Sequence, residues 1–220
     1  PFVAIVGQEE MKTALLLNVV LPSIGGVLVQ GEKGTAKTTA VRGLADIMGN
    51  TRVVELPVSA SEDRVVGTIN LNKVIKEGEK QFDPGLLKEA DGNILYVDEI
   101  NLLDDHLVDV LLDAAATGVN YVERDGISVT HSAKFALVGT MNPEEGTLRP
   151  QLLDRFGLSV SVTSSLTAAE RAEVIRRRIA FERNPEGFLA EYQAESRQLV
   201  DVLKNARGLV EQTEVSDEIV

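Results

Sequence analysis

The chain has 220 residues, enough for one large domain or for one domain with an appendage. It contains no cysteine, which excludes disulfides and thiolate metal sites, and its two histidines have no partners for a zinc site. Because 34 acidic residues outweigh 22 basic ones, the net charge is −12, which argues against a general nucleic-acid binder. No apolar run reaches the ~20 residues of a membrane span and no secretory signal is visible, so we expect a cytoplasmic or equivalent soluble location.

The first third of the chain alternates between helical and strand patterns. A helix is expected over residues 8–21, and a short apolar strand over 27–30 leads into a glycine-rich loop. The apolar spacing of residues 38–48 predicts a second helix directly after that loop. Residues 52–56 are typical of another strand. The following stretch, 57–85, mixes prolines and glycines with polar residues and is interpreted as an insertion.

The next part continues the alternation. Residues 94–97 and 135–138 predict buried strands, an amphipathic helix is expected over 104–117, and another strand over 158–162. A hairpin is expected over 119–131, because an Asp-Gly pair separates two alternating runs. Strands that alternate with helices predict an α/β fold with a mostly parallel sheet covered on both faces.

After the last strand the pattern becomes helical. Thr167 and Glu170 form a capping box, in which each side chain covers an unpaired N–H at the start of a helix. A further helix is expected over 188–206, with Gly208 suited to its C-terminal cap. We therefore predict a core, residues 1–162, followed by a helical segment, residues 163–220.

The glycine-rich loop, "GEKGTAKT" at residues 31–38, matches the phosphate-binding pattern G-x-x-x-x-G-K-[ST] except that Ala36 replaces the second glycine. Backbone N–H groups and the positive end of the following helix would bind an anion there. Lys37 is expected to reach the terminal phosphates and Thr38 to ligate Mg²⁺. If position 36 needs a left-handed backbone, alanine costs ~1–2 kcal/mol there, but the donors remain. A plain strand–turn–helix corner is the alternative.

Polar residues follow two of the predicted core strands. Asp98 is expected to hold the Mg²⁺ shell, and Glu99 to polarise the attacking water as general base. Asn142 could contact the γ-phosphate or orient the water, although an Asn-Pro pair also commonly starts a turn. Arg149 and Arg155 are candidates for stabilising phosphoryl-transfer charge, often from a neighbouring subunit. A local surface pair between Arg155 and the adjacent aspartate is the alternative.

Several long phrases resemble one family, the AAA+ ATPase (I) subunit of magnesium chelatase. They are "IVGQEEMK" before the loop, "SASEDRVVGTI" (59–69), "FDPGLLKEADGNILYVDEINLLDDHLVDVLLDAAATGVNYVERDGISV" (82–129) and "MNPEEGTLRPQLLDRFGLSV" (141–160). The resemblance covers nearly the whole chain, and it is far more specific than a Walker motif because these phrases recur in order.

The resemblance assigns a role to each motif. It implies Walker B at Asp98 and Glu99, sensor 1 at Asn142, and the arginine finger at Arg155, with Arg149 the weaker candidate. Residues 57–85 resemble the family's insert in its second helix, 119–131 its hairpin before sensor 1, and 163–220 the beginning of its helical lid. The implied nucleotide-binding residues, including Walker A, are Val6, Gln8, Gly31, Glu32, Lys33, Gly34, Thr35, Ala36, Lys37, Thr38 and Thr39.

The family's activity supplies further expectations. Such ATPases use ATP and Mg²⁺, form ring hexamers, and work with an integrin-domain D subunit and a porphyrin-binding H subunit to insert Mg²⁺ into protoporphyrin IX. The alternatives are a cobalt chelatase ATPase of corrinoid synthesis, a chaperone-like AAA+ ATPase that activates a metalloenzyme, and a non-catalytic nucleotide switch.

Overall fold

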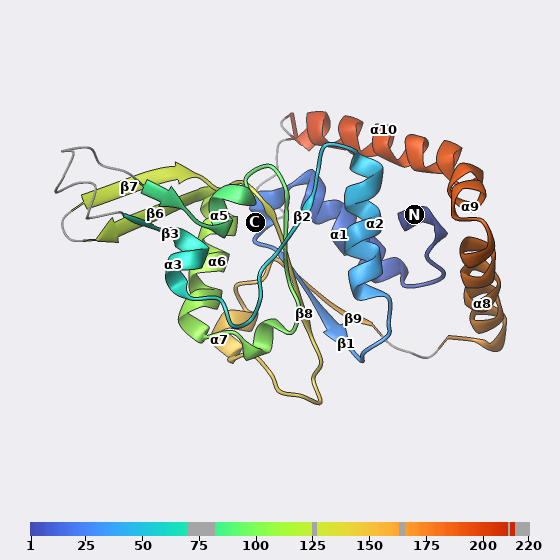
Figure 1. The fold of residues 1–220 in the computed structure, drawn as a ribbon, viewed down its shortest axis with the longest axis horizontal. Helices are drawn as coiled ribbons and strands as arrows, with labels where there is room; N and C mark the ends of the chain where they lie inside the picture. Colours follow the sequence, from blue (N-terminus) through green and yellow to red (C-terminus); the bar gives the residue numbers. More distant parts are fainter. Residues whose placement is uncertain (70–81, 125–126, 163–165, 211, 214–220) are drawn as a thin grey trace.

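Figure 1 shows the computed structural model, which describes residues 1–69, 82–124, 127–162, 166–210 and 212–213. The middle of the predicted insertion and the Asp-Gly turn of the predicted hairpin lie outside the described residues.

A parallel five-stranded sheet forms the centre of the fold, in the order β2–β5–β8–β1–β9. Its strands are β1 (Val27–Gly31), β2 (Val53–Glu55), β5 (Ile94–Val97), β8 (Ala136–Met141) and β9 (Leu158–Val162). Strands β5 and β8 are buried along their whole length, because inner strands of a parallel sheet are covered on both faces. The predicted α/β fold with its parallel five-stranded sheet is confirmed.

Helices cover both faces of this sheet. Successive side chains of a strand point to opposite faces, so Tyr96 joins one buried cluster and Val97 the other. The first face carries α1 (Glu9–Val20), α2 (Lys37–Met48) and α10 (Gln193–Val210). The second carries α3 (Glu62–Val66), α5 (Leu86–Glu89), α6 (Asp105–Thr117) and α7 (Pro150–Leu153). Short 3-10 turns are η1 (Phe2–Ala4), η2 (Pro22–Ile24) and η3 (Ile100–Leu102).

Two antiparallel strand pairs project from the second face (Figure 1). One is the predicted hairpin, β6 (Val119–Arg124) with β7 (Ile127–Ser132), and the other is β3 (Gly67–Ile69) with β4 (Phe82–Pro84), which belongs to the predicted insertion. The buried Asn120 side chain donates to the Val66 carbonyl at 2.9 Å, and the Phe82 and His131 rings lie 5.6 Å apart. The ring contact joins β4 to β7, and the Asn120 hydrogen bond joins β6 to the end of α3, directly before β3.

The helical segment contains three described helices, α8 (Ala168–Arg183), α9 (Pro185–Glu191) and α10. The predicted capping box of Thr167 and Glu170 is present at the start of α8. The prediction of one helix from residue 188 to 206 is wrong in its bounds. Asn184 caps α9 by accepting the Gly187 N–H at 3.0 Å, so a helix starts at Pro185, before the predicted start.

At its other end, α10 continues through Gly208 to Val210, so this glycine is not a cap. Tertiary contact holds the last turns of the helix, because the Arg207 guanidinium donates twice to the Val19 carbonyl of α1. Within the described part of the chain, no helix combines the length and apolarity needed to cross a membrane.

Candidate functional site

The glycine-rich loop connects the carboxyl end of β1 to the first turn of α2, as predicted. Gly31 is required by close packing, because a Cβ atom there would lie 2.3 Å from the Val162 carbonyl oxygen of β9. Ala36 is the residue before α2 and has φ 62° and ψ 17°, a left-handed conformation. Position 36 therefore needs the backbone geometry that glycine adopts freely and alanine adopts at a cost.

Lys37 folds back over the loop. Its Nζ donates to the carbonyl oxygens of Gly31 and Glu32, the latter at 3.0 Å. Burial lowers the pKa of the Lys37 ammonium from its usual range, while the nearby Asp98 carboxylate opposes the shift. The ammonium is thus held inside the concave side of the loop, where an anion would meet it together with the backbone N–H groups.

The two predicted magnesium ligands lie at the same edge of the sheet and share a partner. The Tyr96 hydroxyl lies 2.8 Å from Thr38 Oγ1 and donates to Asp98 Oδ1 at 3.1 Å. Thr140 on the neighbouring strand β8 donates to the same Asp98 oxygen at 2.6 Å. Burial raises the pKa of Tyr96 to about 12, so the phenol stays protonated and remains a donor.

Neither Tyr96 nor Thr140 was among the predicted site residues. Strand periodicity offers a signal for Tyr96, because residues two apart on a strand point the same way and Asp98 follows two positions later. No comparable signal marks Thr140, whose position beside β5 depends on strand order.

Glu99 begins the turn after β5 in a left-handed conformation, with φ 55° and ψ 50°. Its backbone N–H donates to Thr140 Oγ1 at 3.1 Å, and its carboxylate lies 3.2 Å from Lys33 Nζ. Lys33 also lies 2.8 Å from the Glu145 carboxylate. These contacts bring the glycine-rich loop, the end of β5 and the loop after β8 together.

Asn142 follows β8 at the same edge and is buried. Its Oδ1 accepts the Glu144 N–H at 3.2 Å, so it forms a turn as well as occupying the predicted corner. A hydrogen bond from Lys33 lowers the pKa of the neighbouring Glu145 carboxyl, with a smaller contribution from Asn142. The turn interpretation of this asparagine is confirmed, and its contact with the γ-phosphate or the water stays a prediction.

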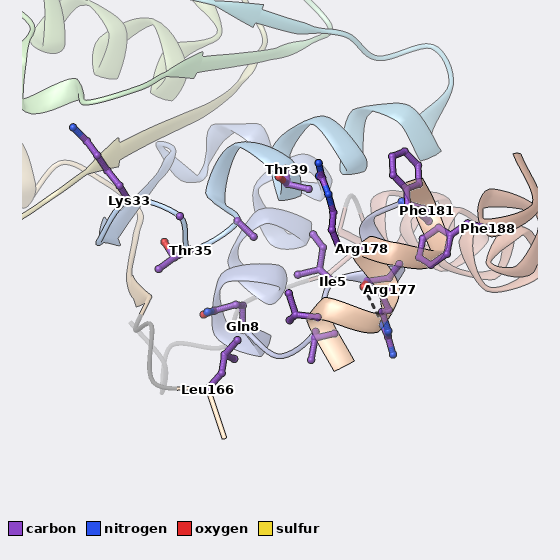
Figure 2. Close-up of a pocket in the computed structure, with 16 residues that line it drawn as sticks. Ile5, Gln8, Lys33, Thr35, Thr39, Leu166, Arg177, Arg178, Phe181 and Phe188 are labelled. Carbon is purple, nitrogen blue, oxygen red and sulfur yellow. Dashed lines mark hydrogen bonds between the residues drawn. The ribbon is translucent and has the colours of Figure 1, made fainter. Parts of the chain in front are cut away.

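A cavity of about 370 Å³ opens beside the loop (Figure 2), within the range of small-molecule sites. The predicted residues that line it are Val6, Gln8, Lys33, Gly34, Thr35, Ala36 and Thr39. Its apolar wall also includes Val174 and Phe181 of α8 and Phe188 of α9, which were not predicted. Arg177 of α8 donates to the Ala4 carbonyl at 2.9 Å and so joins the helical segment to the N-terminal wall.

Backbone strain is concentrated in this region. Among the described residues, the non-glycine residues with positive φ are Gln8, Ala36 and Glu99. Gln8 and Ala36 line the cavity, and Glu99 contacts Lys33 at its rim. Such conformations cost of order 1–3 kcal/mol each and cluster at functional sites.

The two candidate arginines do not line this cavity. Arg155 pairs with Asp109 and Asp113 of α6 instead of the adjacent aspartate, and Arg149 pairs with Asp105 at 2.6 Å. The Arg155 backbone lies beside Gly25, because a Cβ atom added to Gly25 would be 3.3 Å from the Arg155 carbonyl oxygen. Gly25 precedes β1, whereas the phosphate loop follows β1. A strand of this length spans about 16 Å, so Arg155 lies toward the opposite edge of the sheet from the phosphate loop.

The parallel sheet has a phosphate-type loop after β1, two carboxylates after β5 and a polar residue at the end of β8, which lies between these two strands. This arrangement defines a P-loop ATPase of the AAA type. The sequence matches the AAA domain (dynein-related subfamily) over residues 26–156, and the chain belongs to this family. Enzymes of this class use a nucleotide together with Mg²⁺.

Within that class, the chain belongs to the magnesium-chelatase I subunits. It is 49% identical to a magnesium-chelatase subunit ChlI homolog of Methanocaldococcus jannaschii, covering 100% of this chain and 70% of the relative. It is 46% identical to the ChlI subunit of Synechocystis, covering 98% and 71%. It also resembles a cryo-EM-based structure of the complex between the BchI and BchD subunits of magnesium chelatase, with 47% identity, a TM-score of 0.73 and 99% and 78% coverage.

Proposed function

We propose that this chain is the ATP-hydrolysing motor of a magnesium-chelatase complex, in which hydrolysis drives Mg²⁺ into protoporphyrin IX. The observation that carries the proposal is the convergence of Lys37, Thr38, Asp98 and Glu99 at one edge of the sheet, beside a cavity of nucleotide size. The family membership and the likeness to the BchI–BchD complex support the chelatase context.

The residues present fit Mg²⁺ and ATP. The amides of the loop and the start of α2 offer donors to phosphate oxygens, and Thr38 and Asp98 offer oxygen ligands that Mg²⁺ prefers. Bound Mg²⁺ would neutralise the charge that develops on the phosphates. Lys37 would move from its two carbonyl partners to phosphate oxygens, while the apolar wall of the cavity would cover the base.

In this proposal Glu99 accepts a proton from the attacking water, and Asn142 orients that water or contacts the γ-phosphate. Arg155 acts on the nucleotide of a neighbouring subunit, because its position toward the far edge of the sheet prevents it from reaching its own loop. A ring, expected to be a hexamer, is the assembly that would supply this arginine. Integrin-domain D and porphyrin-binding H subunits are the proposed partners.

We also propose that residues 1–162 form the ATPase core and that 163–220 form the beginning of the lid. The contribution of α8 and α9 to the cavity supports this division, because a lid of an ATP site must cover the nucleotide.

Two variants test the ATPase. Lys37→Ala removes the cation of the loop and should abolish nucleotide binding, measured with a fluorescent ATP analogue. Glu99→Gln keeps the shape of the side chain but removes the base, so it should bind ATP normally and lose turnover. Full hydrolysis by Glu99→Gln would contradict the assignment of the base.

The chelatase context needs a second assay. The protein is combined with integrin-domain D and porphyrin-binding H subunits of a magnesium chelatase, protoporphyrin IX and ATP, with Mg²⁺ and Co²⁺ as alternative substrates supplied in parallel. Insertion of Mg²⁺ that stops in Lys37→Ala supports the proposal. Insertion of Co²⁺ alone would support the cobalt chelatase alternative, and ATP hydrolysis without insertion of either metal would support a chaperone-like role.

A further inference from the structure

Lys33 bridges two carboxylates at the rim of the nucleotide cavity. Its Nζ lies 2.8 Å from Glu145 Oε1 and 3.2 Å from Glu99 Oε1. The Lys33 ammonium donates hydrogen bonds to Glu145 and to Glu99, and these bonds, the one to Glu145 first, raise its pKa, so it stays charged. Lys33 belongs to the glycine-rich loop, whereas its partners follow β5 and β8, so the bridge connects three segments of the site.

The ion pair with Lys33 restrains the carboxylate of Glu99, the proposed base. The left-handed backbone of Glu99 and its N–H bond to Thr140 fix the direction in which the side chain leaves the main chain. They do not fix the χ angles of this side chain. The side chain lies at the cavity rim and is 31% exposed. The ion pair with Lys33 holds the end of that side chain.

Glu145 adds a second carboxylate to the ion pair between Lys33 and Glu99. Two carboxylates contact the ammonium, at 2.8 Å and 3.2 Å, and these two ion pairs restrain it although its own side chain is 70% exposed. Lys37, by contrast, donates to loop carbonyls, so the two lysines of the loop have separate partners. One lysine faces the phosphate-binding concavity and the other faces the proposed base.

We propose that Lys33 is a positioning residue for ATP hydrolysis, which orients the Glu99 carboxylate toward the attacking water through the bridge shared with Glu145. The inference rests on the proposed role of Glu99 as the base. It assigns to the third residue of the loop a function in turnover that is separate from phosphate binding.

The test compares Lys33→Met, which removes the charge at similar length, with Lys33→Arg, which keeps it. Lys88→Met is the matched control, because Lys88 is an exposed lysine of α5 that lies 3.8 Å from the partly buried Asp91 carboxylate, outside the cavity. The measurements are kcat at saturating Mg²⁺ and ATP, and the Kd for a fluorescent ATP analogue. The free energy of an exposed ion pair such as Lys33–Glu99 corresponds to a change in kcat of about two- to fivefold.

We expect Lys33→Met to lower kcat by about two- to fivefold with a smaller change in Kd, Lys33→Arg to restore most of the loss, and Lys88→Met to match the wild type. An unchanged kcat in Lys33→Met would overturn the inference. So would a weaker Kd with unchanged kcat, which would make Lys33 a phosphate contact, or a raised kcat, which would make the bridge inhibitory.

Glu99→Gln, measured alongside, separates this inference from the proposed function. If Glu99→Gln loses turnover and Lys33→Met keeps it, only the positioning role fails. If Glu99→Gln keeps turnover, the assignment of the base and the positioning role both fail.

Discussion

Ala36→Gly tests whether the loop stores backbone strain. Ala36 has φ 62° and ψ 17°, a conformation that costs an L-residue about 1–2 kcal/mol. Glycine removes that cost, but its greater freedom in the unfolded chain offsets about 0.5–1 kcal/mol of the gain. We therefore expect the free energy of unfolding to rise by about 0.5–1 kcal/mol, which for a domain of this size corresponds to a Tm increase of about 1–4 °C.

The assay is thermal unfolding without nucleotide, at fixed protein concentration. A second alanine-to-glycine variant is measured in parallel as a control. Ala180→Gly is the control, because Ala180 is exposed in the interior of the regular helix α8, where glycine should destabilise by about 1 kcal/mol. The same substitution should thus have opposite signs at the two positions.

Nucleotide affinity sharpens this test. The left-handed conformation is present in the loop as it stands, so the strain affects folding more than binding. We expect the Kd for ATP to change by less than the ~1–2 kcal/mol of the backbone cost. A Tm that falls as far in Ala36→Gly as in Ala180→Gly, or a complete loss of nucleotide binding, would refute the reasoning.

Three further predictions concern other contacts. Gly31→Ala should destabilise the fold by several kcal/mol and displace β9, because its Cβ would lie 2.3 Å from the Val162 carbonyl; urea unfolding measures this, and a wild-type midpoint would contradict it. Tyr96→Phe should raise the Mg²⁺ concentration for half-maximal ATPase activity by about tenfold, since both predicted ligands lose a partner; an unchanged Mg²⁺ titration would show that the hydroxyl does not orient them. Bonds from Thr167 lower the pKa of Glu170 below its usual 4.5, so its stabilising contribution is present above that value and lost as pH falls through the folded pKa. Glu170→Gln should therefore flatten the acid limb of the stability profile, and an unaltered limb would contradict this.

Local signals were sufficient for much of the fold. The apolar runs at 94–97 and 135–138 predicted buried strands, because inner strands of a parallel sheet have no polar face. The capping box of Thr167 and Glu170 is formed within one turn, so it could be predicted without any tertiary information. The end of α10 could not, since the contact of Arg207 with α1 outweighs the usual effect of glycine. The start of α9 does have a local signal that the prediction missed, because Asn184 caps the helix within one turn and proline is favoured in its first turn.

The candidate site also combines features that local sequence predicts with features that only the tertiary structure shows. The sequence by itself determined the loop and the carboxylates after β5, because spacing along one strand or turn fixes which groups are neighbours. Only the tertiary structure decided the left-handed backbone of Ala36, the bridge from Lys33 to Glu145 and the place of Arg155 toward the opposite edge of the sheet. The last two features depend on strand order, which brings together segments more than a hundred residues apart and is not encoded in any local pattern.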